Sequence, residues 1–180
     1  MNLFEKTLHS TSIYKGTIID LEVHDVELPD GQTSKRELIY HNGAVAVCPI
    51  TPENKVILVK QFRKACEKPL LEIPAGKLEQ GEERISAAKR ELEEETGYIA
   101  DELEHITEMY GSPGFSNEKL SIYMAENLTK GKMHLDEDEF LELAYYDMNE
   151  IKTLVDNKEI EDAKTIIALQ HLLLNYNHYK

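Results

Sequence analysis

The segment GKLEQGEERISAAKRELEEETGY spans residues 76–98 and is rich in glutamate, with a glycine at its start and another near its end. Within it, Ile85, Ala88 and Leu92 form an apolar stripe at helical spacing, which predicts a helix that begins after residue 81. Gly97 is well placed to end this helix, because glycine readily adopts the left-handed conformation found just past a helix. The segment therefore predicts a helix with one face in the core and a carboxylate-rich face beside it.

The last turn of this helix gathers three carboxylates. Glu91, Glu94 and Glu95 are three or four residues apart or adjacent, so they project together and repel one another. They also lie at the negative end of the helix dipole, where anions are disfavoured. A divalent cation would remove the conflict, since Mg²⁺ and Mn²⁺ prefer oxygen ligands. The alternative is a solvated acidic face, relieved by the lysine and arginine residues of the same helix.

Length and charge limit the classes of function. The chain has 180 residues, 41% hydrophobic and 30% charged, which predicts one globular domain with a substantial core. Its net charge of -14 argues against broad binding to nucleic acid or to an anionic membrane. No apolar run has the length of a signal peptide or a membrane span. Cys48 and Cys66 form no CxxC pair, so we expect idle thiols in a reducing, cytoplasmic compartment.

The pattern around the segment predicts a sheet with helices. Strand-like runs dominate the first seventy or so residues, and strands and helices are mixed after residue 98. This order predicts a mixed α/β domain in which helices cover a sheet. Strands are expected at 17–28, 34–41, 44–50, 55–62, 70–73, 105–110, 120–125 and 141–146. Helices are expected at 149–156 and 162–176, the latter with Ile166, Ile167, Leu169, Leu172, Leu173 and Tyr176 in the core.

The spacing of fixed residues in the segment resembles the Nudix box of Nudix hydrolases. That box is glycine, five residues, glutamate, seven residues, then Arg-Glu-aliphatic-any-Glu-Glu-any-Gly-aliphatic. Residues 76–98 meet every glycine and charged position, and Tyr98 stands where an aliphatic residue is usual, which puts only a packing detail in doubt. The resemblance implies a Nudix-type α/β/α sandwich with a mixed sheet over residues 43–180. It also implies that an N-terminal β-rich segment, residues 1–42, precedes this domain.

The resemblance also assigns roles within the box. It implies that Glu91 and Glu95 ligate metal, and that Glu94 ligates metal or supports the ligands. Arg90 matches the arginine that orients these glutamates through ion pairs, and Glu82 matches the glutamate that helps to fix the loop. The implied cofactor is Mg²⁺, two or three ions, with Mn²⁺ as a substitute.

Two stretches outside the box are similar to ADP-ribose pyrophosphatases. In LEIPAGK, residues 71–77, the similarity implies that the backbone carbonyl of Ala75 ligates a metal and that Glu72 contacts the adenine side of the substrate. The loop Ser112-Pro113-Gly114 matches a proline marker of that subfamily, which implies substrate binding at Ser112 and Gly114. An ordinary tight turn is the alternative for this loop.

An acidic loop and two arginines complete the expected site. The run DEDE at residues 136–139, which includes Asp138, is similar to the loop that supplies the general base and another metal ligand. Its register favours Glu137 as the base and Glu139 as the ligand, but a slip would exchange them, and a solvated acidic loop is the alternative. Arg36 and Arg63 resemble substrate-binding arginines, and guanidinium groups suit phosphate.

The implied function is hydrolysis of the diphosphate bond of ADP-ribose, or of a related nucleoside diphosphate sugar, to AMP and ribose 5-phosphate. The implied assembly is a homodimer paired through the N-terminal segment, although the hairpin near residues 30–31 could equally fold on its own subunit. One alternative is another nucleotide substrate, such as a dinucleoside polyphosphate. A second alternative, a non-catalytic nucleotide-sensing domain, fits poorly with the intact box.

Overall fold

The computed structural model describes residues 2–137, 139–175 and 179. The chain forms two compact units. The N-terminal unit contains residues 1–43 and 109–119, and the central unit contains residues 44–108 and 120–180.

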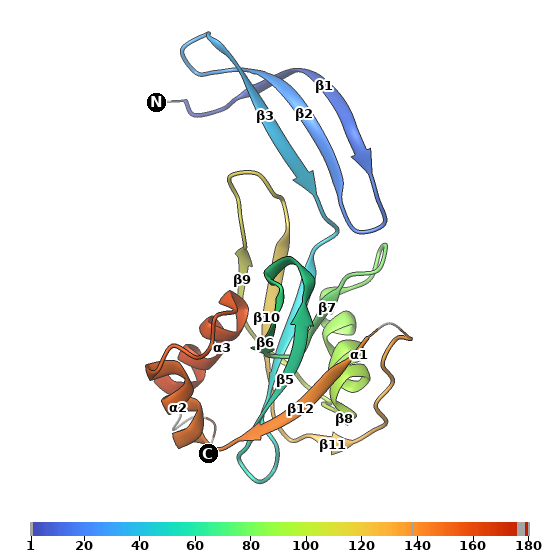
Figure 1. Cartoon of the computed structure of the whole chain (residues 1–180), viewed down its shortest axis with the longest axis vertical. Helices are drawn as coiled ribbons and strands as arrows, with labels where there is room; N and C mark the ends of the chain where they lie inside the picture. Colours follow the sequence, from blue (N-terminus) through green and yellow to red (C-terminus); the bar gives the residue numbers. More distant parts are fainter. Residues whose placement is uncertain (1, 138, 176–178, 180) are drawn as a thin grey trace. The chain divides into compact units, whose positions relative to one another are not determined.

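The N-terminal unit is built on an antiparallel sheet. Its strands β1 (Lys6–Lys15), β2 (Asp20–Glu27) and β3 (Thr33–Tyr40) pair in the order β1-β2-β3 (Figure 1). The turn between β2 and β3 contains Gly31 at φ 85°, a value that favours glycine. The strands predicted at 17–28 and 34–41 are therefore confirmed. β1 was not predicted, because all ten of its residues are exposed and no buried face imposes an apolar alternation on them.

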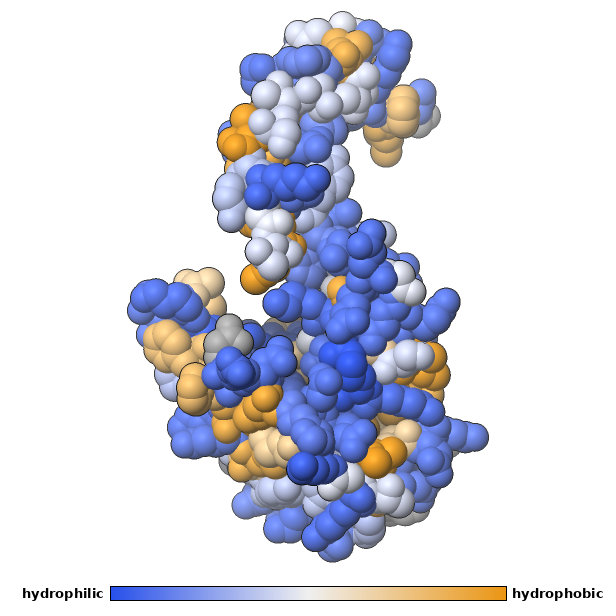
Figure 2. Space-filling view, turned by 90° about the vertical axis from the view of Figure 1, so that its right-hand side faces the viewer, coloured by the Kyte–Doolittle hydropathy of each residue, from blue (hydrophilic) through white to orange (hydrophobic). Residues whose placement is uncertain are grey.

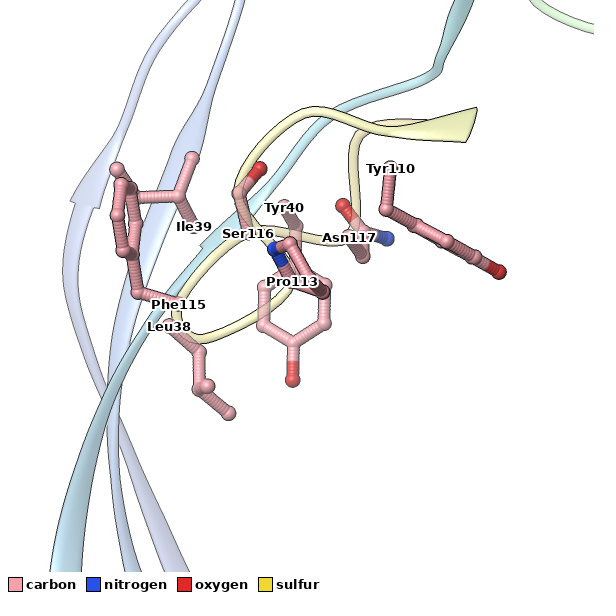
Figure 3. A pocket seen from close by; sticks show the side chains of 8 residues that line it. All are labelled: Leu38, Ile39, Tyr40, Tyr110, Pro113, Phe115, Ser116 and Asn117. Carbon is pink, nitrogen blue, oxygen red and sulfur yellow. The ribbon is translucent and has the colours of Figure 1, made fainter. Parts of the chain in front are cut away.

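Residues 109–119, a loop segment later in the chain, belong to the same unit. The backbone N–H of Ile39 donates to the carbonyl of Phe115 at 2.7 Å, and that of Asn117 donates to the carbonyl of Ile39 at 3.1 Å. These bonds fasten the loop to β3. A pocket of about 360 Å³ lies between this loop and β3 (Figure 3). Its largely apolar lining consists of Leu38, Ile39, Tyr40, Tyr110, Pro113, Phe115, Ser116 and Asn117.

The central unit contains a mixed sheet and a second, antiparallel sheet. The first sheet has the order β7-β4-β10-β9, with β4 parallel to β10 and antiparallel to β7. The second has the order β12-β5-β6, and β8 pairs separately with β11. The strands are β4 (Ala44–Pro49), β5 (Val56–Arg63), β6 (Lys68–Glu72), β7 (Ala75–Lys77), β8 (Tyr98–Ile99), β9 (Glu104–Tyr110), β10 (Lys119–Ala125), β11 (Thr129–Lys130) and β12 (Leu141–Tyr146).

Helices flank these strands. Helix α1 (Arg84–Thr96) lies on one side of them, and α2 (Met148–Asp156) and α3 (Ala163–Leu174) lie on the other, as Figure 1 shows. A 3₁₀ turn, Lys64–Cys66, follows β5. The predicted mixed α/β fold is thus confirmed. Among the described residues, no helix is long and apolar enough to cross a membrane.

The core of the central unit forms where α1 packs on β4 and its neighbours. Ala88 and Leu92 are fully buried there, in one cluster with Val45 and Tyr123. Ile85, in contrast, is 46% exposed, so its predicted place in the core is wrong. It lies in the first turn of α1, before the first buried residue of that helix.

Helix α3 supplies a second packed face. Leu169 and Leu172 are fully buried, as predicted, and Ile166, Ile167 and Leu173 are partly buried. Tyr176 lies outside the described residues. Cys48 is a buried free thiol and Cys66 an exposed one.

Candidate active site

The C-terminal end of α1 brings a carboxylate into the interior. Gly97, in the left-handed conformation at φ 70°, ends the helix, and its N–H donates to the carbonyl of Glu93 at 2.8 Å. In the last turn of the helix, Glu95 is only 2% exposed, and its Oε2 accepts a hydrogen bond of 3.0 Å from the backbone N–H of Ala75. The end of the helix and the start of β7 therefore hold this carboxyl between them.

Arg90 links the other carboxylates. Its Nε and Nη2 donate to the two oxygens of Glu82 at 2.9 and 3.0 Å. Its Nη1 donates to Glu91 Oε1 and to Glu94 Oε2, both at 2.8 Å. Glu82 Oε2 also accepts from the N–H of Glu79 at 3.0 Å, which ties the loop before α1 to the same arginine. The hydrogen bonds from Arg90 lower the pKa of Glu82, and those same bonds raise the pKa of Arg90.

Gly76 gives the carboxyl of Glu91 its space. A Cβ atom added at Gly76 would lie 1.9 Å from Cδ of Glu91, so the carboxyl group of Glu91 would have to move. Gly76 is in β7, paired with Val45 of β4, so its backbone has little freedom to retreat. The first glycine of the segment is thus needed for close approach of strand and helix.

Burial and mutual repulsion disfavour the charged forms of the Glu95 and Glu91 carboxyl groups. Burial, with repulsion from Glu139 and Glu91, raises the pKa of Glu95 to about 8, although the Ala75 N–H opposes this shift. Burial also raises the pKa of Glu91; Arg90 opposes that shift, while Glu94 and Glu139 add to it. Glu139, from the loop before β12, therefore lies within electrostatic range of both. A cation among these groups would favour their charged forms.

A second ionic cluster lies at the ends of β5 and β6. Arg63 donates to the buried carboxylate of Glu72 through Nε at 2.7 Å and through Nη2 at 2.8 Å. Nζ of Lys164 also donates to Glu72. Burial raises the pKa of Glu72, but the bonds and charges of Arg63 and Lys164 outweigh burial, and the net pKa is lowered. The charge of Arg63 opposes the rise in the pKa of Glu95, so the two clusters are within electrostatic range of each other.

The family of the chain follows from comparison with known proteins. The model described as the NUDIX domain matches residues 40–169, which include the whole glutamate-rich segment. The chain belongs to the Nudix family. A second model, the nucleoside diphosphate sugar hydrolase N-terminal domain, matches residues 5–39. The resemblance read from the spacing of the Nudix box is confirmed.

Individual Nudix relatives agree with this assignment. An ADP-ribose pyrophosphatase of Bacillus subtilis (strain 168) is 51% identical over 175 residues, covering 96% of this chain and 95% of the relative. A methanol dehydrogenase activator of Bacillus methanolicus is 49% identical over 172 residues, covering 94% and 93%. The crystal structure of an ADP compounds hydrolase has the same fold, with a TM-score of 0.85 at 24% identity, over 98% of this chain and 96% of that one.

The charged residues of the Nudix box contact one another around Arg90, and their roles stay predictions. Arg90 contacts Glu91 and Glu94, as the predicted orienting arginine should, and Glu82 contacts the loop. A solvated acidic face, the alternative for this helix, does not account for the burial of Glu95.

Nudix hydrolases generally need divalent metal ions, and the donor set at the end of α1 fits such an ion. The donors are hard carboxylate oxygens, and a nearby cation would favour their charged forms against the burial that raises their pKa values. As the structure places the described side chains, however, no three or more His, Cys, Asp or Glu residues form a group that could hold a metal ion by themselves. An ion here therefore needs further oxygens, from a backbone carbonyl, water or the substrate, as is usual for Mg²⁺.

The predicted residues of the N-terminal unit are held within that unit. Arg36 forms a fork with Glu5, at 2.9 Å from Nε and 2.7 Å from Nη2. The carbonyl of Ser112 accepts from the N–H groups of Phe115 and Ser116 at 3.1 and 2.9 Å, so this loop does form a turn. Gly114 is exposed, and a Cβ atom added there would meet nothing within 4 Å. These contacts leave the predicted substrate roles open to experiment.

The acidic loop brings one predicted residue to the cluster. Glu139 is half-buried, and its charge raises the pKa of Glu91 and of Glu95. Glu137, in contrast, is exposed, and its side chain forms no hydrogen bond or ion pair with any described residue. Asp138 lies outside the described residues. Lys164 was not predicted at all. The one sequence feature that could have drawn attention to Lys164 is its position, two residues after the expected helix start at Asp162. A cation is unfavourable in the first turn of a helix.

Proposed function

We propose that the chain hydrolyses the diphosphate bond of ADP-ribose, or of a related nucleoside diphosphate sugar, to AMP and ribose 5-phosphate. The observation that supports this proposal is the buried carboxyl of Glu95 at the end of a Nudix box, within electrostatic range of Glu91 and Glu139. The choice of substrate is supported by the 51% identity to an ADP-ribose pyrophosphatase and by the match to a nucleoside diphosphate sugar hydrolase N-terminal domain.

The proposed cofactor is Mg²⁺, two or three ions, with Mn²⁺ as a substitute. The ligands of these ions would be the backbone carbonyl of Ala75 and the carboxylates of Glu91, Glu95 and Glu139. When bound, such ions neutralise phosphate oxygens and lower the pKa of water. Arg90 holds the carboxylates of Glu91 and Glu94 in place by its hydrogen bonds.

The remaining residues act on the substrate and the water. Arg63 and Arg36 donate hydrogen bonds to phosphate oxygens, and Ser112 and Gly114 contact the substrate from their loop. Glu72 accepts three hydrogen bonds from Arg63 and Lys164, and we propose that it supports Arg63 and contacts the adenine side of the substrate. A water oxygen bonds to one phosphorus as the anhydride oxygen leaves with the other phosphate. Glu137 accepts the proton of that water, with Glu139 as the alternative base.

Hydrolysis in ¹⁸O-water tests the reaction. ADP-ribose is incubated with the protein and Mg²⁺, and the products are identified by mass. We expect AMP and ribose 5-phosphate, with the label in one of them according to the phosphorus attacked. Glu95→Gln should abolish this turnover and leave the fold intact. Near-normal turnover by Glu95→Gln at saturating Mg²⁺ would contradict the ligand role of Glu95. If the protein turns over only dinucleoside polyphosphates, these replace ADP-ribose as the proposed substrate.

The assembly and location belong to the same proposal. We propose a homodimer paired through the N-terminal segment, residues 1–42, with residues 43–180 as the catalytic domain, in the cytoplasm. The support is that β1 is an exposed edge strand that carries Leu8, Ile13 and Tyr14 at its surface. Figure 2 shows apolar surface on this sheet.

A second candidate function is activation of a methanol dehydrogenase, because the Bacillus methanolicus relative of that name is 49% identical. Adding the protein to such a dehydrogenase and measuring alcohol oxidation tests it. The Glu95→Gln variant separates the two functions: activation that survives this change does not depend on diphosphate hydrolysis.

A further inference from the structure

A buried cation stands at the start of α3. The side chain of Lys164 is only 10% exposed, although burial of an ammonium group is costly and the first turn of a helix disfavours cations. Two carboxylates offset this cost. Nζ of Lys164 donates to Glu72 and lies 3.0 Å from Oδ1 of Asp162.

Attachment of α3 does not require this lysine. Oδ2 of Asp162 caps the helix by accepting from the N–H of Thr165 at 3.0 Å and from its hydroxyl at 2.6 Å. The hydroxyl oxygen of Thr165 in turn accepts from the N–H of Ile73 at 2.8 Å. The helix start is thus capped, and fastened to the segment after β6, by neutral groups and one carboxylate. The charge of Lys164 needs another reason.

That reason lies in how Glu72 is shared. Its two oxygens accept two bonds from Arg63 and one from Lys164, and Oε2 takes a bond from each cation. If Arg63 were its only partner, the carboxylate would neutralise that guanidinium alone. Because Lys164 competes for the same charge, Arg63 retains more of its attraction for an anion.

Arg63 has a free face to use. Its side chain is 39% exposed, and with Nε and Nη2 bonded to Glu72, its Nη1 makes no hydrogen bond to any described residue. The guanidinium is also within electrostatic range of Glu95 in the proposed metal site. Its orientation is fixed by Glu72, and the position of Glu72 is fixed from behind by Lys164.

We propose that Lys164 is a positioning residue for phosphate binding. It holds the carboxylate of Glu72 in place, and that carboxylate in turn fixes the orientation of the Arg63 guanidinium. In this orientation Nη1 of Arg63 is free to donate to a phosphate oxygen of the substrate. The proposal rests on the proposed function in one respect, namely that the substrate carries a diphosphate.

The first test is Lys164→Met, which removes the charge and keeps most of the length of the side chain. We expect the KM for ADP-ribose to rise about tenfold at saturating Mg²⁺, with kcat changed less than about twofold, because the lost interaction concerns binding. Lys164→Arg, which keeps a cation, should restore most of the loss. Lys152→Met is the matched control, since Lys152 pairs with Asp156 on the exposed surface of α2, and it should leave both constants unchanged.

A double-mutant cycle tests whether Lys164 acts through Arg63. Arg63→Ala alone should raise KM, and adding Lys164→Met to it should raise KM no further. Effects on KM that multiply would overturn the proposal, as would a KM for Lys164→Met equal to that of the wild type. If Lys164→Met fails to fold, Lys164→Gln is judged by the same criteria.

Binding of inorganic pyrophosphate, measured by calorimetry, separates this proposal from the proposed function. Wild-type protein that binds pyrophosphate without hydrolysing ADP-ribose contradicts the proposed function only. Lys164→Met should then still bind pyrophosphate about tenfold more weakly. Equal affinities, or no binding by the wild type, would overturn the positioning role.

Discussion

Gly76 shows how a residue without a side chain can decide the chemistry of a neighbour. Gly76→Ala would place a methyl group on the carboxyl of Glu91, so that carboxyl must move. Because a displacement of about 1 Å can cost about a hundredfold in rate, we expect a loss of kcat of that order, with the fold retained. Steady-state kinetics and circular dichroism measure the two effects.

Gly111→Ala is the control for this change, because an added Cβ there meets nothing closer than Glu118 Oε2 at 3.7 Å. It should leave kcat within about twofold. Full activity of Gly76→Ala would mean that the carboxyl of Glu91 is free to shift and is not a ligand.

Glu137 permits a clean test of the general base, because it is exposed and has no side-chain partner among the described residues. Glu137→Gln should therefore not affect stability. If Glu137 takes the proton from water, kcat should fall by about 10²–10⁴-fold while KM changes little. Normal turnover would move the role to Glu139, whose substitution should then show this loss.

At the scale of the element, α1 ends in a group of like charges that one arginine holds together. Arg90→Met removes hydrogen bonds to three carboxylates, and we expect the metal-free protein to lose about 1–3 kcal/mol of stability in urea unfolding. Added Mg²⁺ should restore part of this loss, since a cation relieves the same repulsion. A stability equal to that of the wild type would show that the carboxylates spread into solvent when Arg90 is absent.

The same turn of α1 should couple metal binding to protons. The pKa of Glu95, raised to about 8, means that this carboxyl is mostly protonated at pH 7 in the metal-free protein. A metal requires the carboxylate, so the proton must leave on binding. Mg²⁺ affinity should therefore fall as the pH drops below about 8 and level off above it.

Calorimetry in buffers of different ionisation enthalpy measures this release. We expect up to about one proton per protein at pH 7 and almost none at about pH 9.5. The Glu95→Gln variant is the control, because its side chain has no proton to release. If the wild type binds Mg²⁺ at pH 7 without releasing a proton, Glu95 is not a ligand.

Local pattern was enough to predict α1 and its end at Gly97, because a helix and its end are set by residues close together in sequence. The contacts of Arg90 with the glutamates of the same segment were predicted from the resemblance to the Nudix box. Strands β4 and β5 were predicted as continuous apolar runs, since β4 is buried along its whole length and β5 over its first four residues. Ile85 was misplaced because helical periodicity gives the face of a residue but not where the packed surface ends.

At the scale of the whole molecule, what the sequence did not reveal depends on long-range partners. Glu72 and Lys164 are 92 residues apart, and only the packing of α3 beside β6 makes a lysine at a helix start reasonable. β1 was missed for a related reason: its pairing with β2 defines it, and its own residues are all exposed. Family resemblance predicted metal ligands, but it did not predict that Lys164 contacts Glu72 behind Arg63.

The exposure of β1 leads to a prediction about assembly. Ile13 is 56% exposed on an edge strand, a surface suited to pairing with a second copy of the chain. If the homodimer forms there, Ile13→Glu should halve the mass measured by light scattering, because a buried unpaired charge opposes association. Leu174→Glu, at an exposed apolar residue of α3, is the control and should leave the mass unchanged. A wild-type protein that is monomeric at micromolar concentration, or an Ile13→Glu variant that stays dimeric, would remove the N-terminal sheet from the interface.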